Sequence, residues 1–557
     1  MEHISSLPKF NFPDVNCKNE PMKQYLKGSQ ERKDLEVVLE KYSNQCTEIP
    51  LVIGNDEIQS KDVRYQVMPF DHSKKIAKYY WASSALIQRA IKEAMDAREK
   101  WEAVPMPEKI SILLKAADLI GGKYRMDMNA ATMLGQGKTI FQAEIDAAAE
   151  LVDFLRFNAY FARDMMKYNP ISDDKKIILN SLRYRGLEGF IAAISPFNFS
   201  AIGGNLATAP ALMGNVVLWK PSDTSILSSY VAFKAFIEAG FPRGVINFIP
   251  CDGPVFGDTI VRSPHLAGIN FTGSVATFRH LWKQVGENLE TYKTFPRMVG
   301  ECGGKNYHFV HPSADIDTVV NCTIRGAFEY SGQKCSACSR FYVPESLWDS
   351  YSSEFKIRKE LVQIHKEIKV GSPTDYESFL SSVIDEKSFN RIKGYIDYAK
   401  SNETDLTIIA GGNCDKTKGY FVEPTIIQTT NPNDKLMKEE IFGPVLTVYV
   451  YRDSEMEEAL DLVGTTTPYA LTGAVFARDK EFLKIAAERL KMTAGNFYMN
   501  DKSTGAVVGQ QPFGGGRLSG TNDKAGGPHY LLRWTTPQTV KESFVLQKEW
   551  KYPYMQN

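Results

Sequence analysis

One cysteine in this sequence lies among residues that suit a nucleophile. Cys335 stands in FEYSGQKCSACSR, residues 328–340, where its neighbours are small and polar rather than apolar. A thiolate is a strong nucleophile and a competent leaving group, and backbone N–H groups with a nearby cation lower the pKa of a thiol placed among them. The stretch therefore predicts covalent catalysis by Cys335, with the thiol pKa lowered in this way.

Two other interpretations of Cys335 stay open at this point. A buried cysteine commonly packs as a small apolar side chain. Cys335 and Cys338 also form a CxxC pair, as found in zinc and thioredoxin-type sites. No second CxxC or paired histidine lies at zinc spacing, and His308 and His311 alternate with apolar residues in HFVH as in a strand. We therefore expect no metal site.

A glutamate upstream favours the catalytic interpretation. Glu301 lies in GECGGKN, beside a glycine pair and 34 residues before Cys335. An E-x-G-G-K motif followed at this distance by G-Q-x-C resembles the aldehyde dehydrogenase superfamily, in which the glutamate activates water and the cysteine is the nucleophile. Asn198 in SPFNFS matches the family asparagine whose side-chain amide forms the oxyanion hole with the cysteine N–H. A thiohemiacetal alkoxide requires such donors where its charge develops.

Strands and helices alternate from residue 189 onward, which predicts βαβ units and a parallel, doubly wound sheet. Such sheets bind ligands beyond the carboxyl ends of their strands. The sequence has no G-x-G-x-x-G motif. Instead FTGS, residues 271–274, ends a strand and opens a helix whose free N–H groups can receive a pyrophosphate.

The resemblance implies NAD as the cofactor. An acid at Asp223 repels a 2′-phosphate, which favours NAD over NADP. The implied cofactor-binding residues are Lys220, Ser222 and Asp223 in WKPSD near the adenosine ribose, Gly273 and Ser274 at the pyrophosphate, Glu440 at the nicotinamide ribose and Phe442 near its ring.

Further stretches narrow the resemblance to the branch of the superfamily that oxidises L-glutamate γ-semialdehyde. These are AEIDAAAELVDFLRFN, FTGSVATFRHLWKQVG and STGAVVGQQPFGG. This semialdehyde forms when 1-pyrroline-5-carboxylate opens by hydrolysis, and its oxidation to L-glutamate is the second step of proline degradation. The implied substrate contacts are Glu150 and Ser336 in the aldehyde pocket, Phe199 and Phe513 beside the aliphatic stem, and Gly505 and Ala506 at the carboxylate.

The resemblance leaves other activities open. Some animal members carry serine at position 506, so the alanine here offers no side-chain hydroxyl. Another semialdehyde, such as that of succinate, pairs an aldehyde with a carboxylate in the same way. Cys335 with Glu301 also suits an NAD-independent cysteine hydrolase or acyltransferase. A binding protein on a former enzyme scaffold is disfavoured because the catalytic residues are intact.

Composition limits the partners and the compartment. Lys plus Arg equals Asp plus Glu at 66 each, so no basic surplus favours nucleic acid or an anionic membrane. Eight cysteines in 557 residues fit reduced thiols. The N-terminus shows neither an apolar signal segment nor an Arg-rich transit peptide, whereas the family is usually mitochondrial in eukaryotes. We expect the mitochondrial matrix by analogy, with the cytoplasm as the alternative.

The expected fold class is α/β and aldehyde dehydrogenase-like, with two doubly wound αβα domains and a small β arm for oligomerisation. The uncharged run at 189–219 contains prolines and asparagines that would break a membrane-spanning helix. Residues 139–166 are expected to form one long helix. We assign residues 1–167 and 188–300 to an NAD-binding domain, 301–525 to a catalytic domain, and 168–187 and 526–557 to an arm that builds a homodimer.

Overall fold

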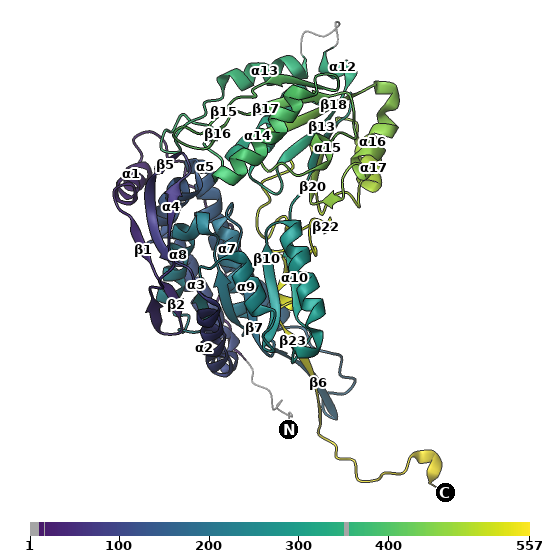
Figure 1. Cartoon of the computed structure of the whole chain (residues 1–557). Helices are drawn as coiled ribbons and strands as arrows, with labels where there is room; N and C mark the ends of the chain where they lie inside the picture. The colour runs from purple at the N-terminus through teal and green to yellow at the C-terminus, as the bar shows by residue number, and fades with distance from the viewer. Residues whose placement is uncertain (1–9, 16, 350–355, 557) are drawn as a thin grey trace.

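The computed structural model describes residues 10–15, 17–349 and 356–556. Two seven-stranded sheets organise these residues, one in each half of the molecule (Figure 1). The first sheet has, in spatial order, β11 (Arg297–Glu301), β10 (Leu266–Thr272), β7 (Phe190–Ile194), β8 (Val216–Lys220), β9 (Ile246–Phe248), β2 (Leu51–Ile53) and β3 (Asp56–Ile58). From β11 to β9 every pairing is parallel.

Helices cover both faces of the first sheet. Successive strand residues point to opposite faces, so Ala193 packs in one core cluster while Ala192 packs in the other. One face carries α3 (Met106–Gly121), α4 (Arg125–Gln136), α6 (Leu151–Met165), α7 (Ser200–Leu212) and α8 (Ile226–Ala239). The other carries α2 (Ser84–Ala103), α9 (Gly253–Ile260) and α10 (Val275–Glu287).

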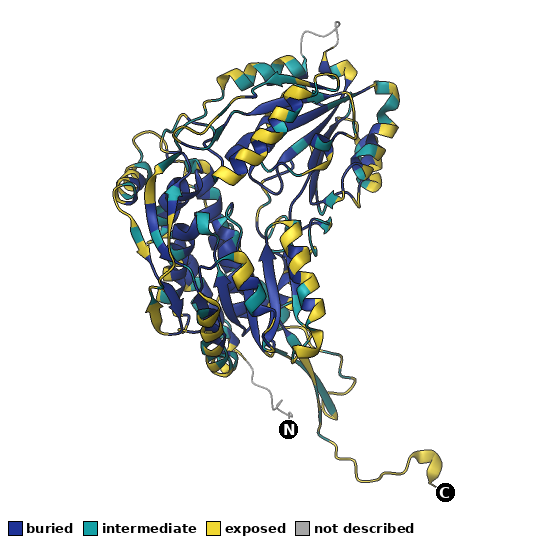
Figure 2. Cartoon of the chain, viewed as in Figure 1, coloured by how far each residue is buried: buried dark blue, intermediate teal, exposed yellow. Residues whose placement is uncertain are grey.

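The second sheet has the order β14 (Leu406–Ala410), β17 (Thr425–Thr429), β18 (Val445–Tyr451), β13 (Cys338–Pro344), β12 (Asn306–Val310), β20 (Thr472–Phe476) and β21 (Asn496–Met499). Its pairings are parallel apart from that of β14 at the edge. One face is covered by α11 (Ile316–Phe328) and α13 (Ile357–Glu367), the other by α16 (Met456–Thr465) and α17 (Lys480–Arg489). The strands of both sheets are mostly buried (Figure 2). This is the predicted fold class.

Smaller elements complete the chain. A three-stranded sheet is formed by β1 (Thr47–Ile49), β5 (Asp71–Tyr80) and β4 (Val63–Met68), and α1 (Gln30–Ser43) packs against α4. The helix α14 (Glu386–Ser401) lies beside β14. The strands β6 (Ile178–Arg185) and β23 (Thr536–Ser543) form an antiparallel ribbon that projects from the first half of the molecule (Figure 1). The role of this ribbon as a dimer arm stays a prediction.

The long helix expected at 139–166 is interrupted by a π-helical segment. Helix α5 (Ile140–Ala143) runs into a π-helix, Glu144–Glu150, which continues as α6. A π-helical turn holds an extra residue and so rotates the side chains that follow it. Glu144 and Asp146 are fully buried within the protein, whereas Glu150 faces a cavity. The apolar periodicity therefore predicted the helix but missed the change in its pitch.

The uncharged run at 189–219 folds as β7, α7 and most of β8, as its prolines and asparagines indicated. Within the described ranges, no helix is long and apolar enough to cross a membrane.

Candidate active site

The order of strands in the first sheet places two predicted catalytic residues at one edge. The chain runs from β7 outward through β8 and β9 on one side, and returns to β10 and β11 on the other side of β7. Ligands bind at such a switch point, beyond the carboxyl ends of the strands. Asn198 follows the end of β7, and Glu301 ends β11 opposite Thr272 of β10.

The nucleophile is presented by a constrained loop between α11 and β13. Tyr330, Ser331 and Gly332 have φ values of 52°, 54° and 65°, so two of them are non-glycine residues in the left-handed region. Such conformations cost free energy and persist where surrounding contacts enforce them. The Ser331 hydroxyl donates to the carbonyl oxygen of Ser381 at 2.6 Å. A Cβ at Gly332 would lie 2.2 Å from the carbonyl oxygen of Gly443, so only glycine fits there.

A cavity of about 270 Å³ joins the site residues. The lining includes two of the predicted catalytic residues and all of the predicted substrate contacts: Cys335, Glu301, Glu150, Phe199, Ser336, Gly505, Ala506 and Phe513. These residues come from both halves of the molecule and are separated by up to several hundred positions in sequence. The fold therefore assembles the pocket that the motifs predicted.

Asn198 lies beside this cavity and is not part of its lining. Its side chain is buried, and its Nδ2 donates to the backbone carbonyl of Gln333 at 3.0 Å. Gln333 precedes Cys335 by two residues, so the asparagine binds the loop of the nucleophile directly. An amide nitrogen has two N–H groups, and one remains to contact an oxyanion.

The pKa of Cys335 differs from the sequence-based expectation. Burial raises it well above the ordinary value, and the carboxylates of Glu301 and Glu440 raise it further, while the cysteine's own backbone N–H lowers it. Lys334, the cationic residue that precedes Cys335 in the sequence, pairs its ammonium with Glu329 at 2.9 Å. The positive charge of Lys334 is therefore paired with a carboxylate.

The position of Glu301 in the cavity and its raised pKa both suit a general base. Burial raises its pKa to about 8, with Lys524 acting in the opposite direction. Its Oε1 is buried and accepts no hydrogen bond from any described residue. A carboxylate with a free lone pair and a pKa near neutrality can take a proton from water or from a thiol. Lys524 and Asp523 lie in a glycine-rich stretch, residues 503–527, and no motif pointed to either.

A second acid in the cavity has a similar pKa. Burial raises the pKa of Glu150 to about 8, and the negative charge of Asp146 contributes. Lys138 pairs with Asp146 at 2.8 Å, and its ammonium lies 4.1 Å from the ring centroid of Phe199. The Lys138–Asp146 pair therefore packs against Phe199, which lines the cavity.

The backbone at Gly505 and Ala506 is suited to bind an anion. Gly505 has a φ of +92°, which glycine adopts without strain. Neither residue's N–H donates a hydrogen bond to any described residue. The hydroxyl of Ser336, a predicted contact in the aldehyde pocket, shares a hydrogen bond of 2.7 Å with that of Thr504. The loop is thereby fixed next to the nucleophile.

The predicted cofactor residues lie at neighbouring strand ends. Lys220 ends β8, and Ser222 and Asp223 follow it. Gly273 and Ser274 follow β10, and the Ser274 hydroxyl caps α10 by accepting from the N–H of Thr277 at 3.2 Å. Only β7 separates β8 from β10. Asp223, beside the end of β8, suits the ribose of a dinucleotide. The N-terminus of α10, beside the end of β10, suits its pyrophosphate.

Glu440 and Phe442 lie where the second half of the molecule meets this edge. The Glu440 carboxylate accepts from the N–H of Gly304 at 2.8 Å, and a Cβ at Gly303 would clash with that carboxylate. Phe442 has a φ of 55° and packs edge-on against Phe197 at 5.8 Å. The residues present therefore fit a dinucleotide.

The two cysteines of the CxxC pair lie in different surroundings. Cys335 lines the cavity, whereas Cys338 packs in the core of the second half of the molecule, where its thiol donates to the carbonyl oxygen of Arg340 at 3.5 Å. Both thiols are free. Among the described residues no three His, Cys, Asp or Glu side chains are grouped to hold a metal ion.

Comparisons with known proteins agree with this geometry. The model of the aldehyde dehydrogenase family matches residues 58–540. The chain is 57% identical over 547 residues to a protein of Danio rerio named Delta-1-pyrroline-5-carboxylate dehydrogenase, mitochondrial, covering 98% of this chain and 97% of that protein. A Homo sapiens protein of the same name is 56% identical over 539 residues, covering 97% and 94%.

Solved structures agree as well. The crystal structure of Delta-pyrroline-5-carboxylate dehydrogenase from Mycobacterium tuberculosis bound with NAD has a TM-score of 0.92 and 43% identity, covering all of both chains. A Thermus thermophilus 1-pyrroline-5-carboxylate dehydrogenase has a TM-score of 0.87 and 30% identity, covering 97% and 100%. The chain belongs to the aldehyde dehydrogenase family.

Proposed function

We propose that this chain oxidises L-glutamate γ-semialdehyde, formed from 1-pyrroline-5-carboxylate, to L-glutamate with NAD, as the second step of proline degradation. One observation carries the proposal: a single cavity holds the thiol of Cys335, the buried carboxylate of Glu301 and the free N–H groups of Gly505 and Ala506. An aldehyde and a carboxylate on one small substrate match these groups. The names of the similar proteins give the same activity.

The first half of the reaction forms a bond between enzyme and substrate. Cys335 first loses its proton to solvent, so that Glu301 acts only in the second half of the reaction. The thiolate sulfur then attacks the aldehyde carbon and forms a thiohemiacetal. The Cys335 N–H and the second N–H of the Asn198 amide hold the oxygen on which charge develops. NAD, when bound, supplies the acceptor for the hydride that leaves the carbon.

The second half releases the acid. Glu301 removes a proton from a water molecule, which attacks the thioester carbon and frees Cys335 as the leaving group. Phe199 and Phe513 line the cavity and exclude bulk water from the aliphatic stem. Cys335, Glu301 and Asn198 thus each act on an atom that changes during one of the two steps.

The residues that would hold NAD follow from the strand ends described above. Lys220, Ser222 and Asp223 would bind the adenosine ribose, and Gly273 with Ser274 the pyrophosphate. Glu440 would bind the nicotinamide ribose, and Phe442 would pack near the ring. We assign residues 1–167 and 188–300 to NAD binding and 301–525 to catalysis on this basis.

The activity is tested by following NADH formation with 1-pyrroline-5-carboxylate as substrate. We expect kcat/KM for glutamate γ-semialdehyde to exceed that for succinate semialdehyde by at least about tenfold, which is about 1.4 kcal/mol. The reverse order would identify another semialdehyde as the substrate. Ester hydrolysis without any NAD-dependent oxidation would identify a cysteine hydrolase instead.

We further propose a homodimer located in the mitochondrial matrix. The ribbon of β6 and β23 projects from the molecule (Figure 1), and exposed apolar side chains flank it, including Ile171 at 86% exposure and Leu546 at 74%. The Danio rerio and Homo sapiens relatives are named as mitochondrial. Analytical ultracentrifugation that finds only monomer would refute the homodimer. Cell fractionation that finds the chain in the cytosol would refute the mitochondrial location.

A further inference from the structure

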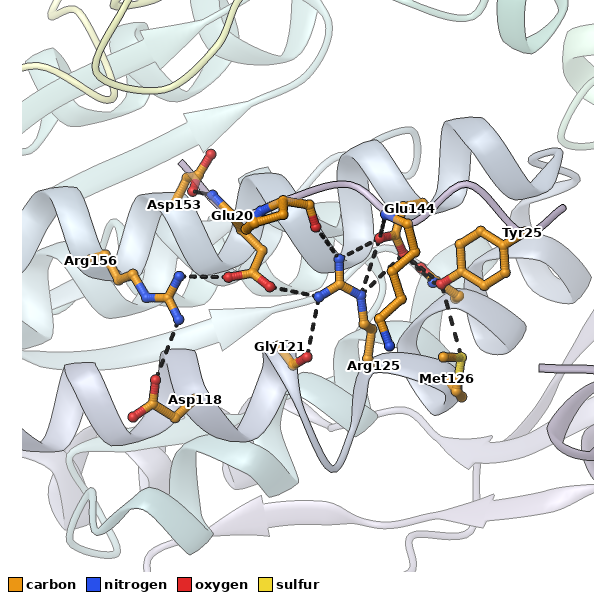
Figure 3. Close-up of polar contacts among 12 residues, drawn as sticks. Glu20, Tyr25, Asp118, Gly121, Arg125, Met126, Glu144, Asp153 and Arg156 are labelled. Carbon is orange, nitrogen blue, oxygen red and sulfur yellow. Dashed lines mark hydrogen bonds and ion pairs between the residues drawn. The ribbon is translucent and has the colours of Figure 1, made fainter. Parts of the chain in front are cut away.

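A segment near the N-terminus, residues 19–25, packs against the helices that flank the cavity (Figure 3). We call this segment the strap. It has no regular secondary structure, precedes α1 and lies outside the 58–540 region that matches the family model. Its contacts reach the π-helix, α4, α6 and the loop at 505–508.

Buried ion pairs anchor the strap to the helices. The Glu20 carboxylate pairs with Arg125 and Arg156, each at 2.6 Å. The Arg125 guanidinium also pairs with Glu144 and donates to the carbonyl oxygen of Pro21 at 2.8 Å. The side chains of Arg125 and Glu144 are only 3% and 0% exposed. Removing one partner from such a network leaves an uncompensated buried charge, so its members act together.

The same strap binds the carboxylates on either side of Glu150. At the start of the π-helix, Glu144 accepts from the N–H of Lys23 at 2.8 Å and from the Tyr25 hydroxyl at 2.7 Å. In α6, Asp153 accepts from the N–H of Glu20 at 2.7 Å. The strap therefore spans the turn that carries Glu150 into the cavity.

One side chain of the strap connects this turn to the anion-binding loop. The Asn19 Nδ2 donates to Asp153 at 2.8 Å and to the carbonyl oxygen of Val508 at 2.9 Å. Its Oδ1 accepts from the side chain of Gln510 at 2.8 Å. Asn19 thus bridges two walls of the pocket that lie hundreds of residues apart in sequence.

Between the anchors, Met22 faces the cavity. It lines the same space as Glu150, Ala506 and Cys335 and is partly buried there. A methionine side chain fills irregular apolar space, so Met22 limits the room available to a substrate.

We propose that the strap determines substrate selectivity, with Met22 as a wall of the cavity and Asn19 as a positioning residue for the 505–508 loop. This inference rests on the proposed function, because the loop is the site assigned to the substrate carboxylate. The alternative is a strap that only stabilises the fold. A strap that sets selectivity and a strap that only stabilises the fold predict changes in different kinetic quantities.

The first experiment compares glutamate γ-semialdehyde with 2-aminoadipate 6-semialdehyde, which is one methylene longer. Met22→Ala enlarges the cavity and should favour the longer substrate. We expect kcat/KM for the longer substrate, divided by kcat/KM for the shorter one, to rise by at least about fivefold, because one methylene in an apolar pocket changes kcat/KM by about tenfold or more. The matched control is Leu26→Ala, beyond the strap and 67% exposed, which should leave the ratio unchanged. An unchanged ratio in Met22→Ala overturns the assignment of Met22.

The second experiment separates positioning from stability. Asn19→Ala should raise KM for glutamate γ-semialdehyde by about three- to tenfold while kcat, and kcat/KM for propionaldehyde, stay within about twofold. Tyr25→Phe removes a buried hydrogen bond to Glu144 without contacting the loop, and should lower Tm but leave KM unchanged. Equal losses for both aldehydes in Asn19→Ala, or the same KM rise in Tyr25→Phe, overturn the positioning role.

Failure of the proposed function is distinguishable from failure of this inference. An unmodified chain that does not oxidise glutamate γ-semialdehyde refutes the function before any variant is made. An active unmodified chain whose Met22 and Asn19 variants keep the original selectivity refutes the strap alone.

Discussion

The side-chain amide of Asn306 holds the backbone of the nucleophile Cys335. Its Nδ2 donates to the carbonyl oxygens of Cys335 at 2.7 Å and Ala337 at 2.8 Å, and its Oδ1 accepts from the N–H of Thr472 at 3.0 Å. Asn306 begins β12 and ends the GECGGKN motif, whose second residue is Glu301, the proposed base. One short motif therefore contains the proposed base and also fixes the backbone position of Cys335.

Asn306→Ala should damage both stability and activity. The change leaves three buried backbone groups without a partner, at roughly 1–3 kcal/mol each. We expect a lower Tm and a kcat reduced by at least about tenfold, measured by calorimetry and NADH formation. The control is Asn321→Ala, an exposed asparagine on α11 whose side chain donates to the carbonyl oxygen of Asp317. An unchanged kcat in Asn306→Ala would show that the loop is held by its other contacts.

Cys335→Ser should abolish aldehyde oxidation, because a serine hydroxyl without a dedicated paired base is a weak nucleophile at neutral pH. Cys338→Ser keeps the cavity intact and should retain most of the activity. Steady-state NADH assays of both variants check this. If Cys338→Ser is the inactive one, the nucleophile has been misassigned.

Glu301→Gln should separate the two halves of the reaction. Hydride leaves the substrate before the step in which water is activated, so a rapid burst of NADH should be followed by slow turnover. Stopped-flow absorbance measures the burst. Loss of the burst itself would place Glu301 in the first half, as the base that deprotonates Cys335.

The rate of thioester hydrolysis should depend on pH through Glu301. Only its deprotonated form accepts a proton from water, and burial raises its pKa to about 8. The rate should therefore fall as the pH drops below about 8 and level off above it. Glu150 also has a pKa of about 8, so Glu150→Gln is the control. The inflection should persist in Glu150→Gln and vanish in Glu301→Gln.

Gly505→Val should weaken binding of the carboxylate. The φ of +92° strains any β-branched side chain, so the valine distorts the two free N–H groups. We expect KM for glutamate γ-semialdehyde to rise by at least about tenfold, or about 1.4 kcal/mol, with much smaller effects on uncharged aldehydes. Ala506→Ser should change little, because the backbone makes the contact. Equal losses for both kinds of aldehyde would assign the loop a general structural role.

The sequence by itself determined which elements form the two large sheets and predicted which residues do chemistry. The strands of both large sheets and the helices between them follow from local apolar periodicity, which reports the buried face of each element. The glycine motifs around Glu301 and Cys335 were informative because the backbone there approaches other atoms too closely for any Cβ, as at Gly303 and Gly332. These are local constraints, and local sequence expresses them.

Only the tertiary structure decided the electrostatics of the site and the walls of its cavity. The pKa of Cys335 is raised because the fold buries the thiol and places it near the carboxylates of Glu301 and Glu440. The strap could not be foreseen, since Asn19 meets Val508 across 489 positions of sequence. Burial and long-range pairing depend on which elements the whole fold brings together, and no short stretch of sequence carries that information.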